Sequence, residues 1–305
     1  MIWVERGNPV TQNPDTGKVI EAFRSLDFRV VVDQFMTDTA READIVLPAK
    51  SMFEQSDVIN AYWHHYIQLK QKLIDPPGEV KPETEIFRLL AGRLGLTDEQ
   101  LMGRIPGPTD EEVDEFLEEK LSPFPGLSLE KLRNGPVPAP GSRDIAFDDL
   151  VFKTPSGKIE LFSTEAGERW GVGMTADYVP PLISSNSDLP FVFLTSNTKN
   201  RIHSQFGNLR ITEEFDDPSL VFINPSDAGK KGIAEGDRIE VFNERGSVGG
   251  RARFDFGLRT GCVLIKNGRW MEEGGSVNLL TAQQETDMGH GAAFYDVRVD
   301  IRREA

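Results

Sequence analysis

The sequence predicts a two-part fold: an α/β segment built on a parallel, Rossmann-like sheet, followed by a mostly β domain. Three observations predict it. In the first 50 residues, short apolar runs alternate with stretches whose apolar side chains repeat at helical spacing. From residue 191 onward, short alternating runs recur between turn residues, as in a compact barrel. The length of 305 residues is enough for about two domains.

The α/β segment is predicted from its alternating strand and helix patterns. We expect strands at 1–4, 28–32 and 45–47, helices at about 15–26 and 37–43, and a loop over 5–14. In a parallel sheet, ligands bind beyond the carboxyl ends of the strands. The loops at 5–9, 33–39 and 48–56 are therefore expected to line one crevice.

The middle of the chain is predicted to be partly helical. A linker at 75–82 precedes a helix at 83–94. The run at 110–120 has seven acidic residues in eleven, and its apolar stripe predicts a solvated amphipathic helix or, alternatively, an electrostatic docking face. Residues 121–188 are a connector with one strand pair near Val151–Phe162. The expected domains are 1–120, 121–188 as connector, and 189–305.

The second domain begins its strand pattern at Phe191. Strands are predicted at Phe191–Leu194, Leu220–Phe222, Arg238–Phe242, Val248–Phe254, Gly261–Ile265 and Asp296–Ile301. Between them, Asn224 offers a side-chain cap and Pro225 suits the first position of a short helix. Gly232 or Gly236 can end that helix.

Composition excludes several classes of protein. With 38% hydrophobic and 27% charged residues, and no apolar run near the ~20 residues of a spanning helix, we expect no direct membrane insertion. The single cysteine, Cys262, excludes a disulfide framework and a Cys-rich zinc or iron–sulfur site carried by this chain alone, and it is expected to be a buried strand residue. A net charge of −15 argues against nucleic-acid binding.

The N-terminus shows no basic region followed by an apolar one, so no secretory signal is visible. A strand that starts at the first residue, with no lead-in element, indicates the interior of a larger protein. The compartment stays open, with the cytoplasm favoured over the periplasm.

Two segments are rich in groups that could contact a ligand. The stretch "TSNTKNRIHSQFGN" at 195–208 follows a strand and is dense in donors and acceptors, which suits a large polar ligand but also a hydrophilic surface loop. The stretch at 274–297 is rich in glycine, which permits close backbone approach and equally serves turns. His64 and His65 are adjacent, so we expect them to cap or pack rather than to bind one metal.

Five segments together resemble a known family. They are "GNPVTQNPD" at 7–15, "VVVDQFMTDTAREADIVLPA" at 30–49, "TPSGKIELFS" at 154–163, "INPSDAGKKGIAEGDRIEVFNERGSV" at 223–248 and "VNLLT" at 277–281. In this order and spacing they resemble the molybdopterin guanine dinucleotide oxidoreductases, the dimethyl sulfoxide reductase family that includes formate dehydrogenases. The resemblance implies that the C-terminal domain is a double-psi β-barrel, in which the 223–248 unit is scaffold.

The resemblance also implies a cofactor and its contacts. The cofactor is bis-molybdopterin guanine dinucleotide (bis-MGD) with molybdenum or tungsten. One group of residues would hold the nucleotide part: Gly7, Asn8, Pro9, Asp33, Phe35, Thr37 and Thr39. A second group would approach the pterin dinucleotide: Thr195, Asn197, Arg201, His203, Ser204, Gln205, Asn278, Asp287 and Gly289. Threonine hydroxyls and a helix N-terminus suit a pyrophosphate, and Asp33 suits a guanine edge or ribose.

The chain departs from the family pattern in having no Cys cluster for a [4Fe–4S] centre and no residue that ligates the metal. We therefore expect the N-terminal part of the same enzyme to be a partner that carries both, and a further candidate partner is an iron–sulfur electron-transfer subunit. Two alternatives stay open. One is a non-catalytic module, or a remnant of a split gene, that holds the pterin dinucleotide. The other is a barrel without cofactor that serves protein contacts.

Overall fold

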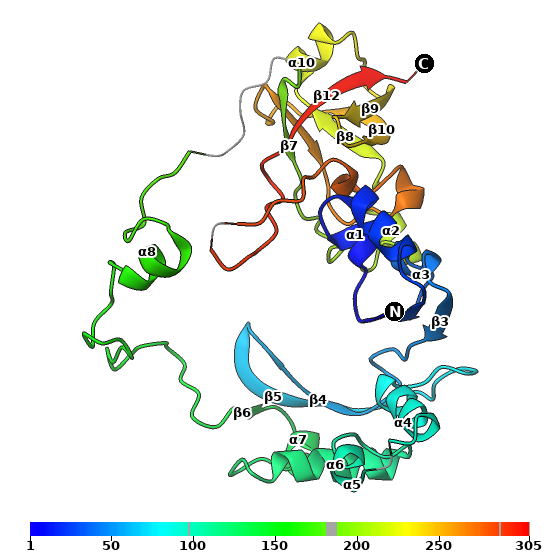
Figure 1. Cartoon of the computed structure of the whole chain (residues 1–305), viewed down its shortest axis with the longest axis vertical. Coiled ribbons are helices and arrows are strands. Elements are labelled where there is room, and N and C mark those ends of the chain that lie inside the picture. Colours follow the sequence, from blue (N-terminus) through cyan, green and yellow to red (C-terminus); the bar gives the residue numbers. More distant parts are fainter. Residues whose placement is uncertain (97, 181–187, 287, 305) are drawn as a thin grey trace. The chain divides into compact units, whose positions relative to one another are not determined.

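The structure, a computed structural model, describes residues 1–96, 98–180, 188–286 and 288–304 (Figure 1). The chain forms two compact units. The first contains residues 1–31, 36–45 and 161–305, and the second contains residues 32–35 and 46–160. This grouping differs from the expected boundaries at 120 and 188, because most of the first 45 residues pack with the C-terminal barrel.

The N-terminal α/β part has the predicted parallel sheet. Its strands are β1 (Ile2–Glu5), β2 (Arg29–Asp33) and β3 (Ile45–Pro48), in the order β1-β2-β3. The helices α2 (Thr16–Arg24) and α3 (Asp38–Arg41) also lie where they were expected.

The prediction of a loop over 5–14 is wrong in its second half. A one-turn helix, α1 (Pro9–Gln12), occupies it. Pro9 stands at the first helical position, where its fixed φ suits the helix and its missing N–H has no partner to lose. The helix α2 follows at once because the Asp15 side chain accepts a hydrogen bond from Lys18 N.

The C-terminal part is a closed barrel of six strands (Figure 1). They are β7 (Phe191–Leu194), β8 (Leu220–Ile223), β9 (Arg238–Phe242), β10 (Ser247–Phe254), β11 (Cys262–Ile265) and β12 (Arg298–Arg303). All six predicted strands are confirmed within about three residues at each end. Short helices lie between these strands: α9 (Arg210–Glu213), α10 (Pro225–Lys230), and the 3₁₀ turns η1 (Met271–Glu273) and η2 (Val277–Leu279). The helix α8 (Thr164–Trp170) precedes the first strand of the barrel in the chain.

The barrel is built from two topologically equivalent halves. The order around it is β10-β8-β11-β7-β12-β9, with β8 parallel to β10 and β7 parallel to β11. Exchanging β7, β8 and β9 for β10, β11 and β12 preserves every pairing and its direction. This internal symmetry agrees with the double-psi β-barrel that the resemblance implies.

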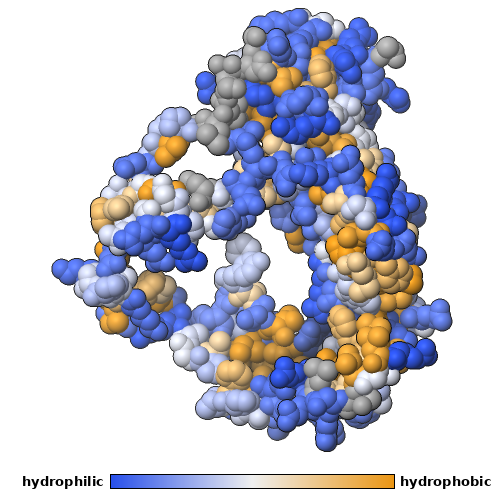
Figure 2. All heavy atoms as spheres, viewed as in Figure 1, coloured by the Kyte–Doolittle hydropathy of each residue, from blue (hydrophilic) through white to orange (hydrophobic). Residues whose placement is uncertain are grey.

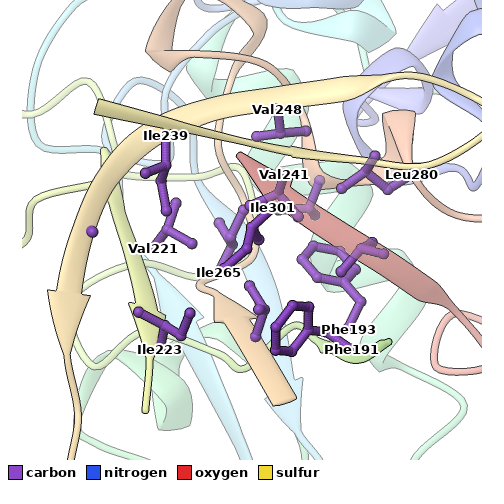
Figure 3. Packing of buried hydrophobic residues seen from close by; sticks show 14 of the residues in the cluster. Phe191, Phe193, Val221, Ile223, Ile239, Val241, Val248, Ile265, Leu280 and Ile301 are labelled. Carbon is purple, nitrogen blue, oxygen red and sulfur yellow. The ribbon is translucent and has the colours of Figure 1, made fainter. Parts of the chain in front are cut away.

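One continuous apolar core fills the barrel (Figure 3). Ile239 and Val241 of β9 are fully buried, whereas Arg238, the first residue of the strand, is exposed. The alternation of polar and apolar residues in the sequence predicts this pattern. Leu280, just after η2, adds to the same core. Because the sheet closes on itself, its strands leave no free edge.

The 223–248 segment acts as scaffold in this barrel. Asn224 caps α10 by accepting from Ser226 N at 2.9 Å, and its own amide donates to Leu258 O at 2.8 Å. Asp227 accepts from Gly261 N at 2.6 Å. The short helix therefore fastens the turn that leads into β11. Cys262, which opens β11, is partly exposed rather than buried as expected, because it begins the strand.

The second unit combines a small antiparallel sheet with four helices. The sheet order is β4 (Asp57–Ala61), β5 (His64–Lys70), β6 (Val137–Pro138), and the helices are α4 (Glu83–Arg93), α5 (Glu99–Met102), α6 (Asp110–Leu121) and α7 (Leu129–Arg133). The acidic helix is amphipathic as predicted, with Val113 and Leu117 in the core. The β4–β5 hairpin was not predicted, since polar and apolar residues alternate poorly along it.

The predicted strand pair near Val151–Phe162 is wrong. The segment contains a turn, in which Gly157 N donates to Thr154 O at 3.0 Å, but it has no strand. Its apolar side chains stay uncovered, with Leu161 83% exposed. A strand pair forms only where one face can be buried, and the described residues offer this segment no such surface.

The surface shown in Figure 2 is largely polar, with hydrophobic residues gathered over parts of the second unit. They include exposed side chains of α4 such as Leu89. Among the described residues, no helix is long and apolar enough to cross a membrane.

Candidate functional site

Asn278 ties the barrel to the N-terminal segment within the first unit. Its amide Nδ2 donates to Thr11 O at 2.8 Å and to Gln12 O at 3.1 Å. Nearby, Thr281 Oγ1 accepts from Asp15 N at 3.2 Å. The "VNLLT" segment and the "GNPVTQNPD" segment, which the sequence nominated separately, are thus brought together. The donors of Asn278 are used in this contact.

Asp38 forms a second link between the same two parts and was not among the predicted site residues. Its Oδ2 accepts from Thr11 Oγ1 at 2.7 Å and from Met271 N at 3.0 Å. Burial raises the pKa of Asp38, and the hydrogen bonds from Thr11 and Met271 oppose this effect. The clue in the sequence was an acidic residue at the first position of a short helix, between two predicted threonines.

Several of the side chains predicted to bind a nucleotide are hydrogen-bonded to one another or to the neighbouring backbone. Thr39 is fully buried, donates from Oγ1 to Asn8 Oδ1 at 2.7 Å and accepts from Val10 N at 3.0 Å. Thr37 caps α3 by accepting from Ala40 N. Gly7 and Pro9 are partly buried beside them. The buried amide Nδ2 of Asn8 has no hydrogen-bond partner among the described residues, so it is the donor of this group left for a ligand.

Asp33 and Phe35 lie in the second unit. Asp33 Oδ1 accepts from the backbone N of Gln34 at 2.7 Å, which bends the chain directly after β2. Phe35 is exposed at the following turn. Asp33 is thus the last residue of β2, one residue later than the predicted strand end, and Phe35 lies in the loop that follows.

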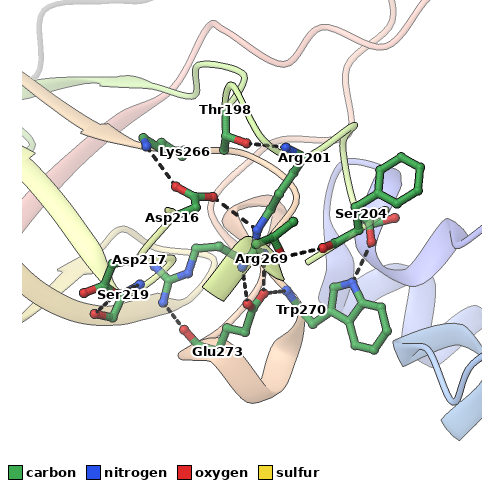
Figure 4. Close-up of polar contacts among 12 residues, drawn as sticks. Thr198, Arg201, Ser204, Asp216, Asp217, Ser219, Lys266, Arg269, Trp270 and Glu273 are labelled. Atoms are coloured by element: carbon green, nitrogen blue, oxygen red, sulfur yellow. Dashed lines mark hydrogen bonds and ion pairs between the residues drawn. The ribbon is translucent and has the colours of Figure 1, made fainter. Parts of the chain in front are cut away.

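Arg201, at the centre of the 195–208 loop, is enclosed by acidic side chains (Figure 4). Its side chain is 3% exposed and that of Asp216 is 2% exposed, with 3.2 Å between Arg201 Nε and Asp216 Oδ2. Arg201 Nη2 lies 2.8 Å from Glu273 Oε1. Lys266 Nζ completes the group at 2.9 Å from Asp216 Oδ1. The predicted ligand donor is thus engaged in an internal charge cluster.

In the rest of the 195–208 loop, the backbone at Ser204 is hydrogen-bonded to the barrel domain, whereas several side chains are exposed. Trp270 Nε1 donates to Ser204 O at 2.9 Å, and Ser204 itself is buried. Thr195 is partly buried at the end of β7. Among the predicted contacts in this loop, the exposed side chains are those of Asn197, His203 and Gln205, and Asn197 Oδ1 also accepts from Asn267 Nδ2 at 2.6 Å. These three are the predicted contacts that the structure leaves accessible to a ligand.

The second glycine-rich stretch is only partly described. Gly289 is exposed and has a φ of 78°, a conformation that favours glycine. In the same stretch, His290 Nδ1 lies 2.8 Å from Glu285 Oε2. Asp287 lies outside the described residues.

Arg269 is a buried charge that the sequence did not nominate. It is 1% exposed, and its Nη2 donates to Gly249 O at 2.8 Å and to Glu273 O. Burial lowers the pKa of Arg269 to about 10, with the positive charge of Arg201 adding to the effect and Glu273 opposing it. The guanidinium therefore keeps its charge at neutral pH.

The adjacent histidines of β5, His64 and His65, contact other residues of the second unit. His64 Nδ1 accepts from Tyr66 N at 3.1 Å. His65 Nε2 lies 3.3 Å from Asp144 Oδ1. Among the residues that the structure describes, no group of three or more His, Cys, Asp or Glu side chains could hold a metal ion.

Comparison with known proteins places the N-terminal and the C-terminal part of the chain in one family. Residues 191–298 match the molydopterin dinucleotide binding domain, and residues 1–93 match the molybdopterin oxidoreductase domain. Probable oxidoreductase YyaE of Bacillus subtilis is 34% identical over 312 residues, covering 99% of this chain and 45% of the relative. A putative catalytic chain of dimethyl sulfoxide reductase from Halobacterium salinarum is 31% identical over 309 residues, covering 96% of this chain and 36% of the relative.

The fold is also found in a solved structure. Acetylene hydratase from Pelobacter acetylenicus superposes with a TM-score of 0.80 at 22% identity, over 99% of this chain and 44% of that chain. The chain thus spans less than half the length of these proteins. Two matched domains of the same kind of enzyme, and relatives that align over nearly all of the chain, lead to one assignment. The chain belongs to the molybdopterin oxidoreductase family.

Proposed function

We propose that this chain binds molybdopterin guanine dinucleotide as the cofactor-binding portion of a molybdenum or tungsten oxidoreductase that uses bis-MGD. The metal ligand and a [4Fe–4S] centre would be supplied by an N-terminal part of the same enzyme, and an iron–sulfur subunit would accept or deliver electrons. When bound, the cofactor supplies two-electron redox chemistry at its metal. The residues of this chain bind and orient it.

One observation carries the proposal. In the segment that matches the dinucleotide-binding domain, the 195–208 loop exposes Asn197, His203 and Gln205. Two contacts fix the same loop to the rest of the domain: the ion pair of Arg201 with Glu273 and the hydrogen bond from Trp270 to Ser204 O. Exposed donors on a fixed loop are what a large polar ligand requires, because ordering the loop does not then oppose binding.

The donor set fits the proposed cofactor. Amide and imidazole groups can hydrogen-bond pterin and guanine ring atoms and phosphate oxygens alike. The buried, unpartnered Nδ2 of Asn8 is a further donor that a ligand would satisfy. Asn278 and Thr39 support this arrangement from within, since their polar groups bond to the chain itself.

The test is the cofactor content of the protein purified from its native host. We expect molybdenum or tungsten together with guanine nucleotide released by acid, and a Cys-rich polypeptide that copurifies or precedes this segment in the same chain. Guanine nucleotide without metal would instead favour a non-catalytic module that holds or delivers the pterin dinucleotide. Protein without either would refute the proposal.

A second measurement addresses the proposed contacts. Replacing His203 or Gln205 with alanine should lower the retained guanine nucleotide by about tenfold, the effect of losing one hydrogen bond to a charged group. The variants should unfold at the same temperature as the wild type, because both side chains are exposed. Unchanged nucleotide content in both variants would contradict the assignment of this loop.

A further inference from the structure

We propose that Arg201 is a positioning residue and not a ligand of the cofactor: with Asp216 and Glu273 it forms an internal anchor that holds the 195–208 loop in its binding conformation. The proposal rests on the proposed function for the identity of the ligand. In this proposal, the exposed side chains of the loop contact the ligand. The acids Asp216 and Glu273 hold the loop in place, a role that the sequence did not suggest.

The first support is that every nitrogen of the Arg201 guanidinium faces an acid of the chain. Nε lies 3.2 Å from Asp216 Oδ2. Nη2 and Nη1 donate to the two carboxylate oxygens of Glu273 at 2.8 and 3.1 Å. A bidentate pair of this kind fixes both distance and plane. Both Nη atoms are hydrogen-bonded to Glu273, and Nε is held within ion-pair distance of Asp216, so the group is directed at acids of the chain on a side chain that is only 3% exposed.

The acids are themselves fixed from other directions. Glu273 Oε2 accepts from Trp270 N at 2.8 Å, and Asp216 Oδ1 lies 2.9 Å from Lys266 Nζ. Figure 4 shows these contacts converging on Arg201 from the segments before β8, after β11 and at η1. The anchor thus joins the loop to three separate parts of the barrel.

The second support is the close approach of the loop backbone to its surroundings. A Cβ on Gly207 would lie 2.6 Å from Arg201 Nη1, so the chain folds directly over the guanidinium. A Cβ on Gly268 would lie 1.8 Å from His203 O, and Gly268 has a φ of 84°. Gly268 is required for the loop to sit this close to the segment after β11, because the atoms that its Cβ would meet are backbone, whereas a side chain at Gly207 would displace the Arg201 guanidinium.

The third support is local strain. His203 and Phe206 have φ values of 51° and 68°, in the left-handed region that non-glycine residues avoid. Such conformations persist only where the surroundings enforce them, and they cluster at ligand-binding loops. The Arg201 anchor and the Trp270 bond to Ser204 O lie on either side of His203 and provide that enforcement.

A direct contact and an anchor predict opposite results for the acids. If Arg201 bound a phosphate, neutralising Asp216 would free positive charge and strengthen binding. If Arg201 is an anchor, the same change loosens the loop and weakens binding. The informative variant is therefore Asp216→Asn, which keeps the shape of the side chain, and the matched control is Asp217→Asn on the adjacent residue, whose carboxylate pairs with Arg251 instead.

The readouts are amide hydrogen exchange of residues 198–208 in the full chain and the guanine nucleotide retained by the purified protein at low and high salt. For Asp216→Asn we expect exchange to rise and nucleotide to fall, each by about tenfold, as for the loss of one charged hydrogen bond. The salt dependence of retention should stay that of the wild type. Asp217→Asn should change neither readout. His203→Ala should lower nucleotide without faster exchange.

Arg201→Lys is a second variant that tests the same anchor if Asp216→Asn does not fold. A lysine keeps the charge but cannot bridge both acids in one plane, so exchange should rise less than in Asp216→Asn. Tighter nucleotide binding in Asp216→Asn, or unchanged exchange in both variants, overturns the proposal. If the wild type carries no guanine nucleotide, the assignment of the ligand is refuted together with the proposed function. Faster exchange of the loop in Asp216→Asn than in the wild type would in that case still establish that Arg201 anchors the loop.

Discussion

At Asn278 the side-chain amide bonds two backbone carbonyls of the N-terminal segment, those of Thr11 and Gln12. The residue is buried, so removal of the amide leaves those acceptors unpaired. We expect Asn278→Ala to lower the free energy of unfolding by about 1–3 kcal/mol. Urea unfolding measures it, with Asn208→Ala as the control, since the exposed Asn208 should change stability by less than about 0.5 kcal/mol. Equal stabilities would show that the amide bonds contribute nothing.

Asp38 makes the same junction pH-dependent. Its pKa is raised above the ordinary 3.8, mainly by burial, so the folded state binds its proton more tightly than the unfolded state does. The stability that Asp38 adds is fully present below pH 3.8 and is lost as the pH rises through the raised folded pKa.

Asp38→Asn tests this sign. We expect the free energy of unfolding of the wild type minus that of the variant to fall as pH rises above 3.8 and to become level by neutral pH. Urea unfolding curves recorded across that range give the difference. A difference that increases with pH would mean that the hydrogen bonds from Thr11 and Met271 outweigh burial.

At the scale of elements, the pairing of β8 with β10 depends on Gly250. A Cβ there would lie 2.5 Å from Ser219 O and 2.6 Å from a methyl of Val221, both in or beside the parallel strand. We expect Gly250→Ala to lower barrel stability by about 1–3 kcal/mol, as overpacking does. Gly229→Ala in α10 is the matched control.

Gly229 lies in a helix with open space at its Cβ, so alanine should be neutral or stabilise by up to about 1 kcal/mol. Thermal unfolding of both variants distinguishes the two cases. Equal melting temperatures would mean that β8 and β10 can separate without loss of stability.

At the scale of the whole molecule, the first unit is assembled from two distant stretches of chain. Residues 1–31 and 36–45 pack with 161–305, and the connection between them runs through the exposed turn at Gly157. A site-specific protease sequence inserted after Gly157 should therefore give two fragments that coelute on gel filtration. The contacts of Asp38 and Asn278 join the fragments.

The control is the same cut in a variant that carries both Asp38→Ala and Asn278→Ala. Its fragments should coelute to a smaller extent, because the links of Asp38 and Asn278 are absent and only contacts such as that between Thr281 and Asp15 N remain. Separate elution of the fragments from the otherwise unchanged chain would refute the grouping of the N-terminal segment with the barrel.

The sequence by itself determined the strands of both parts of the first unit and the helices α2, α3 and α10, but not the one-turn helix α1. Strands such as β9 were predictable because alternation encodes which face is buried, and α10 was predictable because Asn224 and Pro225 act on their immediate neighbours. The family resemblance rests on such local segments, and it located the 195–208 loop and the "VNLLT" segment. The prediction failed at Val151–Phe162, where apolar alternation had no surface to cover.

Only the tertiary structure decided what the nominated side chains do. Arg201 and Asn278 have the chemistry of ligand donors, but their donors face Asp216, Glu273 and Thr11, which lie far away in sequence. Asp38 and Arg269 were not nominated, because burial and long-range partners give them their importance. A hydrogen bond depends on which distant groups folding brings within 3 Å or so of each other, and local sequence patterns do not contain that information.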